Sequence, residues 1–417
     1  MTVMAGAMIQ GRPVIENTTP MQRLTIEAAS RLFHRQSGTS YLSTCTRGLL
    51  PVPARMALAD HAESLANGQV DKSALFAAVE DTRAGFARLI ASHADEVAFT
   101  KNVSEGLNII AAALDWRAEE NVVVCLDMEH PNNVYPWLNL RARHGIEVRR
   151  VAGRDGHVDG GRLIDAIDDR TRLVTMPTVT FAPGFRADVA AVGAICRERG
   201  IFLLVDAVQS VGLLGTDVHA LGVDGLAVST QKGLCGLYGM GFLYCRRGWA
   251  ERLMPAYLAR FSVDLGPGAH EATTGTATYE LMPAARRFDL GNYNYPAIVV
   301  AAQSLNILER VGAEVIESHV TRLSHVLIEG LLEQGLPVAG GEPGPHSGSI
   351  VCIGRVGAGG HDSTDDPQIA ALSRGLEEGG VVHTIRRGMI RLAFHLYNND
   401  GDVERVLDIA RKYPIID

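Results

Sequence analysis

The stretch that decides the fold runs from Ile201 to Arg247 and reads IFLLVDAVQSVGLLGTDVHALGVDGLAVSTQKGLCGLYGMGFLYCRR. It contains three short apolar runs bounded by turn residues, and Lys232 follows the second run. Asp206 closes the first run, and Gln209 lies three residues further on. A lysine at the end of a buried strand is unusual, because desolvation disfavours its ammonium form and lowers its pKa. Such an amine is suited to forming a Schiff base with an aldehyde.

Length and composition limit what the rest of the chain can be. The 417 residues, 47% hydrophobic and 21% charged, suit two or three packed domains. The net charge of −8 offers no basic field for nucleic acid, and no apolar run approaches the roughly 18 residues that span a bilayer. Six cysteines without zinc-type spacing indicate no metal site and a reducing compartment. The N-terminus lacks a signal-peptide pattern, so we expect a cytoplasmic protein.

Strand and helix patterns alternate on both sides of this stretch. Strand patterns lie at residues 96–100, 121–127, 147–151, 172–179, 201–207, 225–230 and 239–246. Helical spacing lies at residues 21–33, 54–92, 105–114, 134–144, 296–311, 313–334, 367–378 and 400–412. This order predicts an α/β fold with a mainly parallel sheet between helices. We divide the chain into an N-terminal segment (1–40) that packs with the small domain, a large domain (41–290) and a small α+β C-terminal domain (291–417).

Two groups of polar residues follow other strands of this pattern. At residues 100–108 a strand passes into a helix with Ser104 as the expected N-cap, and free N–H groups at a helix start can hold a phosphate. His130 lies in the stretch 129–133 after another strand, where an imidazole can stack on a flat ring or shuttle protons. Because ligands bind at the carboxyl ends of strands in open α/β sheets, we expect these groups to meet.

We expect the same carboxyl edge of the sheet to hold Asp206, Ser229 and Lys232 as well. A carboxylate at a strand end could keep a pyridine nitrogen protonated, which turns pyridoxal phosphate into an electron sink. The Ser229 hydroxyl suits a phosphate, and the Lys232 amine suits an aldehyde. Each group alone also fits an ordinary helix cap, surface histidine or solvated lysine. Together the four strand-end sites each fit one part of the same cofactor.

The last constellation is the arginine-rich stretch RRGMIRLAFHLYN at residues 386–398. Arg391 lies inside an otherwise apolar strand, where an unpaired charge is costly. A substrate carboxylate held bidentately would satisfy this arginine. A structural ion pair with an Asp or Glu is the alternative interpretation.

These residues resemble a known family, the pyridoxal-phosphate enzymes of fold type I, aminotransferase class V. Within it they are most similar to the branch of cysteine desulfurases, isopenicillin-epimerase-like proteins and ergothioneine C–S lyases. The matching motifs are VDAVQSVG (205–212), DGLAVSTQKGLCGLYGMGFLY (224–244) and IRLAFHLYNNDGDVERV (390–406). The likeness extends from Tyr41 to the last helix. It implies pyridoxal 5′-phosphate as the cofactor and a homodimer with shared active sites.

The resemblance implies a role for each candidate residue. Lys232 is the Schiff-base lysine and the acid and base at Cα, Asp206 pairs with the pyridine nitrogen, and His130 stacks on the ring. The other implied cofactor contacts are Val103 through its backbone, Ser104, Gln209 at the phenolic oxygen, Ser229, Gln231 and Asn292. The segment with Asn292 is one that the family's dimer sends into the partner's phosphate site. Arg391 clamps the α-carboxylate, with Asn133 and Arg387 as further substrate contacts.

Three departures from the family pattern limit which of the family's reactions this chain can catalyse. Gln231 stands where desulfurases have His, although some class V aminotransferases carry Gln there, and Phe181 stands where the family often has Asn. The stretch 383–390 contains no cysteine, whereas desulfurases place their persulfide-forming nucleophile in this loop. Cys235 lies near the lysine, and we interpret it as structural because relatives without desulfurase chemistry carry it too.

We therefore predict an enzyme that acts on an α-amino acid through a Cα carbanion, by β-elimination or C–S bond cleavage without a persulfide cysteine. Transfer of the amino group to a 2-oxo acid is the second candidate and epimerisation the third. A non-catalytic cofactor-binding homologue is the remaining alternative. The expected partners are a small amino-acid substrate and a second copy of the chain, with no nucleic acid and no membrane.

Overall fold

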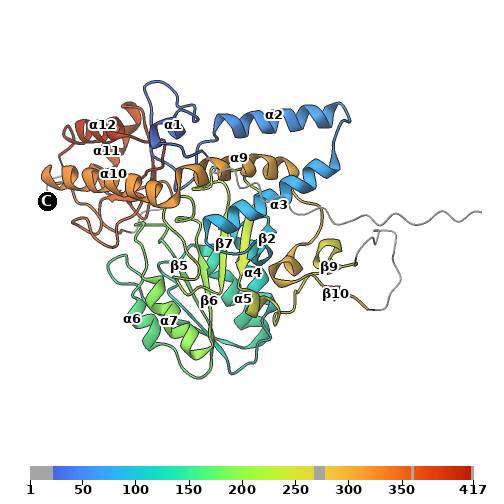
Figure 1. Ribbon diagram of the computed structural model, residues 1–417. Coiled ribbons are helices and arrows are strands. Elements are labelled where there is room, and N and C mark those ends of the chain that lie inside the picture. Colours follow the sequence, from blue (N-terminus) through green and yellow to red (C-terminus); the bar gives the residue numbers. More distant parts are fainter. Residues whose placement is uncertain (1–21, 267–277, 358–360, 415–417) are drawn as a thin grey trace, which may run out of the picture.

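The computed structural model describes residues 22–266, 278–357 and 361–414, and its centre is a seven-stranded sheet (Figure 1). The strand order is β2-β8-β7-β6-β5-β3-β4. The strands are β2 (Val97–Thr100), β3 (Asn121–Val124), β4 (Glu147–Arg150), β5 (Thr171–Pro177), β6 (Phe202–Asp206), β7 (Gly225–Ser229) and β8 (Gly241–Cys245). The pairings are parallel except those of β8, which runs antiparallel to both neighbours. The predicted α/β fold with a mainly parallel sheet is confirmed.

The central strands of the sheet are buried on both faces, which explains their continuous apolar runs, whereas the edge strand β4 is partly exposed. In β6, Leu203 and Val205 belong to one core cluster and Phe202 and Leu204 to the other, because successive side chains point to opposite faces. One cluster also takes residues of α3 (Lys72–Leu89), α7 (Val189–Arg199) and α9 (Tyr295–Val311). The other takes residues of α4 (Val103–Ala113) and α5 (Tyr135–His144). Helices therefore cover both faces, as predicted.

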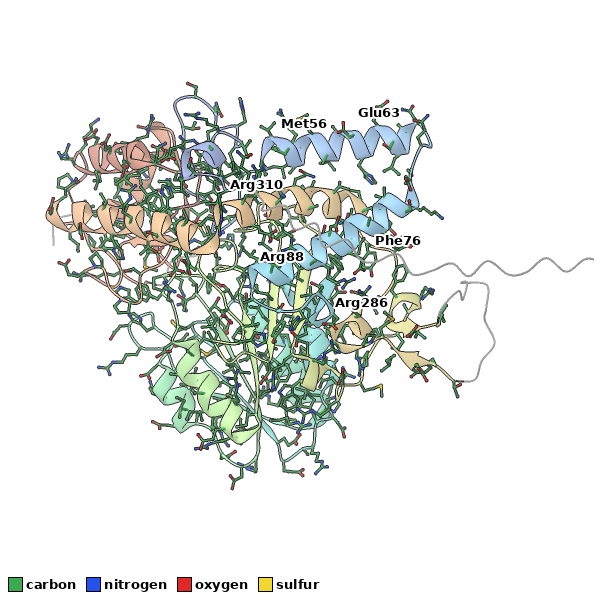
Figure 2. All side chains as sticks on the ribbon, in the orientation of Figure 1. Met56, Glu63, Phe76, Arg88, Arg286 and Arg310 are labelled. Atoms are coloured by element: carbon green, nitrogen blue, oxygen red, sulfur yellow. The ribbon has the colours of Figure 1, made fainter. Side chains whose placement is uncertain are left out.

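The helical spacing over residues 54–92 belongs to two helices, α2 (Val52–Ala66) and α3. Gly68, with a φ of 66°, lies in the turn between them. Both helices pack on α9 (Figure 1). Figure 2 shows Met56 on the outer side of α2 and Arg88 on the side of α3 that faces α9, where its Nη2 donates to Glu309 Oε2 at 2.9 Å. None of the described helices is both long and apolar enough to cross a membrane.

The C-terminal part contains an antiparallel sheet of order β11-β14-β13. Its elements are α10 (Ala313–Glu333), β11 (Ile350–Ile353), α11 (Pro367–Glu378), β12 (Val381–Val382), β13 (Thr384–Arg386), β14 (Met389–Ala393) and α12 (Asp400–Ala410). The described part of the N-terminal segment contacts it, because β1 (Ser40–Tyr41) pairs with β12 and Arg35 forms a 2.7 Å ion pair with Asp402. The helix expected at residues 21–33 is only α1 (Ile26–Ser30). Residues 1–21 of the segment lie outside the described residues, and the domain boundaries stay a prediction.

Candidate active site

A cavity of about 520 Å³ opens at the carboxyl ends of the parallel strands. β2 shares their direction, because β8 is antiparallel to both β2 and β7. The cavity is lined by nine of the twelve predicted site residues: Val103, Ser104, His130, Asp206, Gln209, Ser229, Gln231, Lys232 and Arg391. The three others, Asn133, Asn292 and Arg387, are not among its lining residues. The residues predicted at the strand ends therefore line one cavity, and the three exceptions have separate causes.

Lys232 is positioned by hydrogen bonds of the loop after β7. The Thr230 hydroxyl donates to the Leu237 carbonyl at 2.6 Å, and the Gly48 N–H donates to the Gln231 carbonyl at 2.8 Å. A Cβ on Gly48 would lie 2.3 Å from the carbonyl oxygen of Lys232, so only glycine permits this approach. The lysine backbone is therefore fixed both by its own loop and by the segment that follows β1.

Burial controls the ionisation of Lys232 and Asp206. Desolvation lowers the pKa of Lys232 to about 8, while attraction to Asp206 opposes this change and repulsion from Arg391 adds to it. The neutral amine that a nucleophile or base requires is then accessible near neutral pH. Burial also raises the pKa of Asp206, whereas the Val208 N–H, 3.0 Å from Oδ1, and the charge of Lys232 act to lower it.

Glu129 is a second buried carboxyl group in the cavity, and the sequence analysis gave it no role. Desolvation and then the charge of Asp206 raise its pKa well above the usual value. Its Oε1 accepts from the Asn133 amide at 2.8 Å, and its buried Oε2 has no hydrogen-bond partner among the described residues. Because Asp206 has the favourable contacts to Val208 and Lys232, we infer that Asp206 is charged and Glu129 neutral. A glutamate directly before the site histidine was the signal that could have identified it.

His130 presents a neutral imidazole to the cavity. The Asn132 N–H donates to its Nδ1 at 3.2 Å, so the neutral ring carries its proton on Nε2. Phe181 packs edge-on against the ring with 5.6 Å between centroids. Although the residue stays solvent-accessible, desolvation lowers the pKa of His130 to about 4, with Lys232 and Arg391 adding to this effect. The imidazole is therefore neutral at physiological pH.

The start of α4 forms another wall of the cavity. The N-cap of this helix is Asn102, whose Oδ1 accepts from the Glu105 N–H at 3.0 Å, and not Ser104 as the sequence analysis expected. Ser104 lies in the first turn and still lines the cavity. The Val103 N–H donates to the Ser229 hydroxyl at 2.7 Å, which leaves the hydroxyl proton free to donate. This helix start offers donors and a positive dipole end to an anion.

Gln209 supplies a further group that lacks a partner. Its amide nitrogen donates to the Cys45 carbonyl at 3.0 Å, but its buried Oε1 has no hydrogen-bond partner among the described residues. Unpartnered buried polar atoms are rare in native proteins, so such an atom in a cavity indicates a missing ligand. An aldehyde-reactive amine, a buried carboxylate, a flat imidazole and a helix start for a phosphate meet in one cavity. These residues fit pyridoxal 5′-phosphate.

Asn133 has a structural role instead of the expected contact with substrate. Its amide nitrogen donates to Glu129 Oε1 and to the Thr175 hydroxyl at 2.8 and 2.9 Å. Its Oδ1 accepts from the Trp137 indole at 3.1 Å. Because these bonds occupy both donor protons and the acceptor, this buried amide has no group left for a substrate, and the expectation is corrected.

Arg391 is a buried cation without a carboxylate partner in the part of the chain that the structure describes. It is 3% exposed, and its Nη1 donates to the Phe181 carbonyl. Its Nη2 donates to the Thr46 hydroxyl at 3.4 Å and its Nε to the Thr384 hydroxyl at 3.3 Å. The alternative of a structural ion pair is not found there. A bound anion would supply the compensating charge that this buried guanidinium lacks.

The β13–β14 hairpin places Arg386, for which the sequence predicted no role, at the cavity in place of Arg387. Arg387 and Gly388 form its two-residue turn with φ values of 54° and 80°, the positive values that a type I′ turn requires. The Arg387 guanidinium donates to the carbonyls of Asp127 and Ala182 and is not among the cavity-lining residues. Arg386, the last residue of β13, lines the cavity instead. The expected substrate contact of Arg387 is corrected, because its guanidinium is engaged by these two main-chain carbonyls outside the cavity.

Asn292 lines a separate pocket of about 200 Å³ next to Lys101. Its segment is anchored by Asp289, whose Oδ2 accepts from Arg83 at 2.8 Å and whose Oδ1 accepts from the Phe99 N–H at 2.8 Å. Removing one partner of such a buried ion pair costs about 3–5 kcal/mol. Asn292 therefore does not line the lysine cavity of its own chain, and its role in a partner's site stays a prediction.

Comparison with known proteins identifies the same family. The family model described as Aminotransferase class-V matches residues 58–406. A probable cysteine desulfurase of Methanothermobacter thermautotrophicus is 36% identical over 250 residues, which cover 60% of this chain and 60% of that protein. The uncharacterized aminotransferase YcbU of Bacillus subtilis is 29% identical over 388 residues, which cover 93% of this chain and 98% of that protein.

Solved structures share the fold. An apo cysteine desulfurase from Thermococcus onnurineus NA1 has a TM-score of 0.79 at 24% identity, covering 94% of this chain and 99% of its own. The cystine C–S lyase C-DES, solved with its reaction product cysteine persulfide, has a TM-score of 0.79 at 21% identity, covering 91% and 99%. The predicted fold type I architecture is confirmed.

Proposed function

The chain belongs to the aminotransferase class V family of pyridoxal-phosphate-dependent enzymes, and we propose that it cleaves the bond at Cβ of an α-amino acid, preferably a C–S bond, without a persulfide cysteine. One observation carries this proposal. The cavity combines Lys232, Asp206 and Arg391, whereas the hairpin at residues 384–393 beside it contains no cysteine. Removal of the substituent at Cβ needs Lys232, Asp206 and Arg391, but it does not need a sulfur atom of the protein.

The positions of the cysteines support this proposal. All six cysteines lie within the described residues, and all are free and buried. Cys45 lines the cavity but is 2% exposed. The Cys235 thiol lies 3.3 Å from His395 Nε2, and burial raises its pKa, so the reactive thiolate is disfavoured. An exposed thiolate that could carry sulfur away from the site is not found among them.

Lys232 is the residue that moves protons at the reacting carbons. Bound pyridoxal phosphate supplies an electron sink for the electrons left at Cα. Arg391 holds the α-carboxylate and so orients Cα, and Asp206 provides the negative charge that pairs with the ring nitrogen. Lys232 takes the proton from Cα and gives it to the sulfur, which leaves with the electron pair of the C–S bond. Its pKa of about 8 is close to that of an ordinary thiol, so this proton transfer is nearly balanced.

His130 stabilises the departing sulfur by a hydrogen bond. With Nδ1 occupied by the Asn132 N–H, Nε2–H is the remaining donor. A neutral imidazole does not release this proton at physiological pH, so His130 orients and polarises, and Lys232 remains the acid. The edge-on contact with Phe181 fixes the plane of the imidazole at the cavity wall.

The reaction products test the proposal. Holoenzyme, identified by its visible absorbance, is incubated with cystine or an S-alkylcysteine, and pyruvate, ammonia and released thiol or persulfide are measured. We expect all three products, and Cys45→Ser should keep the rate within about threefold. A loss of about 100-fold in Cys45→Ser would show a sulfur relay through the protein and contradict the proposal.

Transamination is the second candidate, and the relative YcbU favours it, because its similarity extends over almost the full length of both chains. An amino acid supplied with a 2-oxo acid would then give a new amino acid, whereas cystine would give no pyruvate. Lys232 would move the same Cα proton without loss of a group from Cβ.

We also propose a homodimer with shared active sites. Two observations support it: Asn292 does not line the lysine cavity of its own chain, and Tyr238 at the cavity mouth is 58% exposed. Light scattering should give twice the chain mass of 44.8 kDa, and Asn292→Ala should weaken cofactor binding. A monomer with full activity would contradict this arrangement.

A further inference from the structure

Two arginines project from one face of the β13–β14 hairpin. Thr384 lies opposite Arg391 in the strand register, and Arg386 lies opposite Met389. Because alternate residues of a strand point to the same face, Arg386 and Arg391 are diagonal neighbours on that face, about 7–8 Å apart along the backbone. Both guanidinium groups line the cavity that contains Lys232.

The charges of both arginines reach the reacting groups. Arg391 and Arg386 each act to lower the pKa of Lys232 and that of His130, which shows that both cations lie near the centre of the site. His361 also lines the cavity. The hairpin side of the cavity therefore attracts anions, while the carboxylate of Asp206 comes from the sheet edge.

Arg386 has hydrogen-bonding capacity left over. Its Nη1 donates both to Asp362 and, at 2.6 Å, to the Ile385 carbonyl. Within the described residues its Nε and Nη2 make no hydrogen bond. A guanidinium offers five donors in a planar fork, so the Nε–Nη2 edge can bind a second anion while Asp362 stays in place. The Asp362 side chain is 58% exposed, whereas that of Arg386 is 14% exposed.

We propose that the substrate is an amino acid with a second anionic group on its side chain, a carboxylate, sulfinate or sulfonate, and that Arg386 binds this group. The inference rests on the proposed function, in which Arg391 holds the α-carboxylate. Two guanidinium groups on one face of the hairpin then hold the two ends of one short diacid. A neutral side chain would leave the free edge of Arg386 without a partner in a half-closed cavity.

Matched acids test the inference without turnover. Holoenzyme is titrated with butyrate and succinate, and with pentanoate and glutarate, by calorimetry and by the change in cofactor absorbance. We expect the dicarboxylates to bind at least about tenfold more tightly, as charge-assisted bidentate pairs allow. Arg386→Gln should abolish this preference and leave monocarboxylate affinity within about twofold. Arg387→Gln is the matched control, because its guanidinium is bonded to Asp127 and Ala182, and it should keep the preference.

Arg386→Lys covers the case in which glutamine at this position does not fold. Lysine keeps the positive charge but lacks the planar guanidinium that binds a carboxylate through two N–H groups. The preference for dicarboxylates should therefore fall at least about threefold. Equal affinities in the wild type, or an unchanged preference in the lysine variant, would overturn the inference. If no acid binds, the inference is wrong, and so is the proposal that Arg391 holds the α-carboxylate. If the dicarboxylates bind more tightly but no amino acid is turned over, only the proposed reaction is contradicted.

Discussion

The cavity has two sides that differ in how the chain places their residues. One is the sheet edge, where Asp206, Ser229 and Lys232 follow the ends of buried parallel strands. The other is the β13–β14 hairpin, which carries Arg386 and Arg391. At a sheet edge, an error of one residue in a strand boundary leaves the same residues at the same edge. In a hairpin, a shift of one residue exchanges the inward and outward side chains.

The two sides also differ in the chemistry that they supply. The sheet edge holds the groups that fit the cofactor and that we propose to move protons, so changes there should lower kcat. The hairpin holds the cations that we propose to bind the substrate, so changes there should raise KM. Variants on each side of the cavity test this division.

Lys232→Ala should abolish turnover, with a loss of at least about 10²- to 10⁴-fold in kcat, because the acid and base at Cα is removed. Borohydride treatment should fix no cofactor on the variant protein. Lys412→Ala, at an exposed position after α12, is the control and should behave as the wild type. Substantial turnover in Lys232→Ala would remove the lysine from the mechanism.

Asp206→Asn and Glu129→Gln separate the two buried carboxyl groups. Asp206→Asn removes a charge and should lower kcat by about 100-fold or more, as for other electrostatic contacts in active sites. Glu129→Gln replaces a carboxyl group that we infer to be neutral and should change kcat by less than about threefold. Steady-state kinetics measures both. Equal losses in the two variants would show that Glu129 is also charged in the native site.

Arg391→Gln should raise KM by roughly 10- to 100-fold, which corresponds to the about 1.5–3 kcal/mol of a hydrogen bond to a charged group. The value of kcat should change little, because the clamp binds a group that does not react. Arg387→Gln should leave KM within about threefold, since this arginine does not line the cavity: it donates to main-chain carbonyls and Met128 and lies over the Phe181 ring. A larger rise in KM for Arg387→Gln than for Arg391→Gln would reverse the assignment of the hairpin.

The pH dependence of cofactor attachment tests the sheet edge itself. With the pKa of Lys232 at about 8, the neutral amine increases about tenfold between pH 7 and pH 9 and then levels off. Attachment of pyridoxal phosphate to apoprotein, followed by absorbance, should accelerate accordingly. Asp206 raises the pKa of Lys232, so Asp206→Asn should move the midpoint to lower pH. A midpoint near pH 10 would mean that the lysine is not desolvated.

The sequence predicted the sheet edge because short-range patterns determine it. Continuous apolar runs identify strands buried on both faces, and a polar residue directly after such a run must lie at the carboxyl edge. For this reason Asp206, Ser229 and Lys232 could be placed at one edge although they follow two different strands, whereas the role of Gln209 was implied by the resemblance. The free Oε1 of Gln209 and the lowered pKa of Lys232 agree with that assignment.

Other features depend on contacts between distant segments, which only the tertiary structure decides. Asn133 is engaged by Glu129, Thr175 and Trp137, and no local pattern shows that its amide is fully bonded. The choice between Arg386 and Arg387 depends on backbone dihedral angles in a two-residue turn and on the carbonyls of residues 127 and 182. The sequence patterns therefore predicted the fold and the carboxyl edge that lines the cavity, and the resemblance predicted the family. Which arginines line the cavity was decided by long-range packing, because side-chain direction in a hairpin follows the turn and its neighbours.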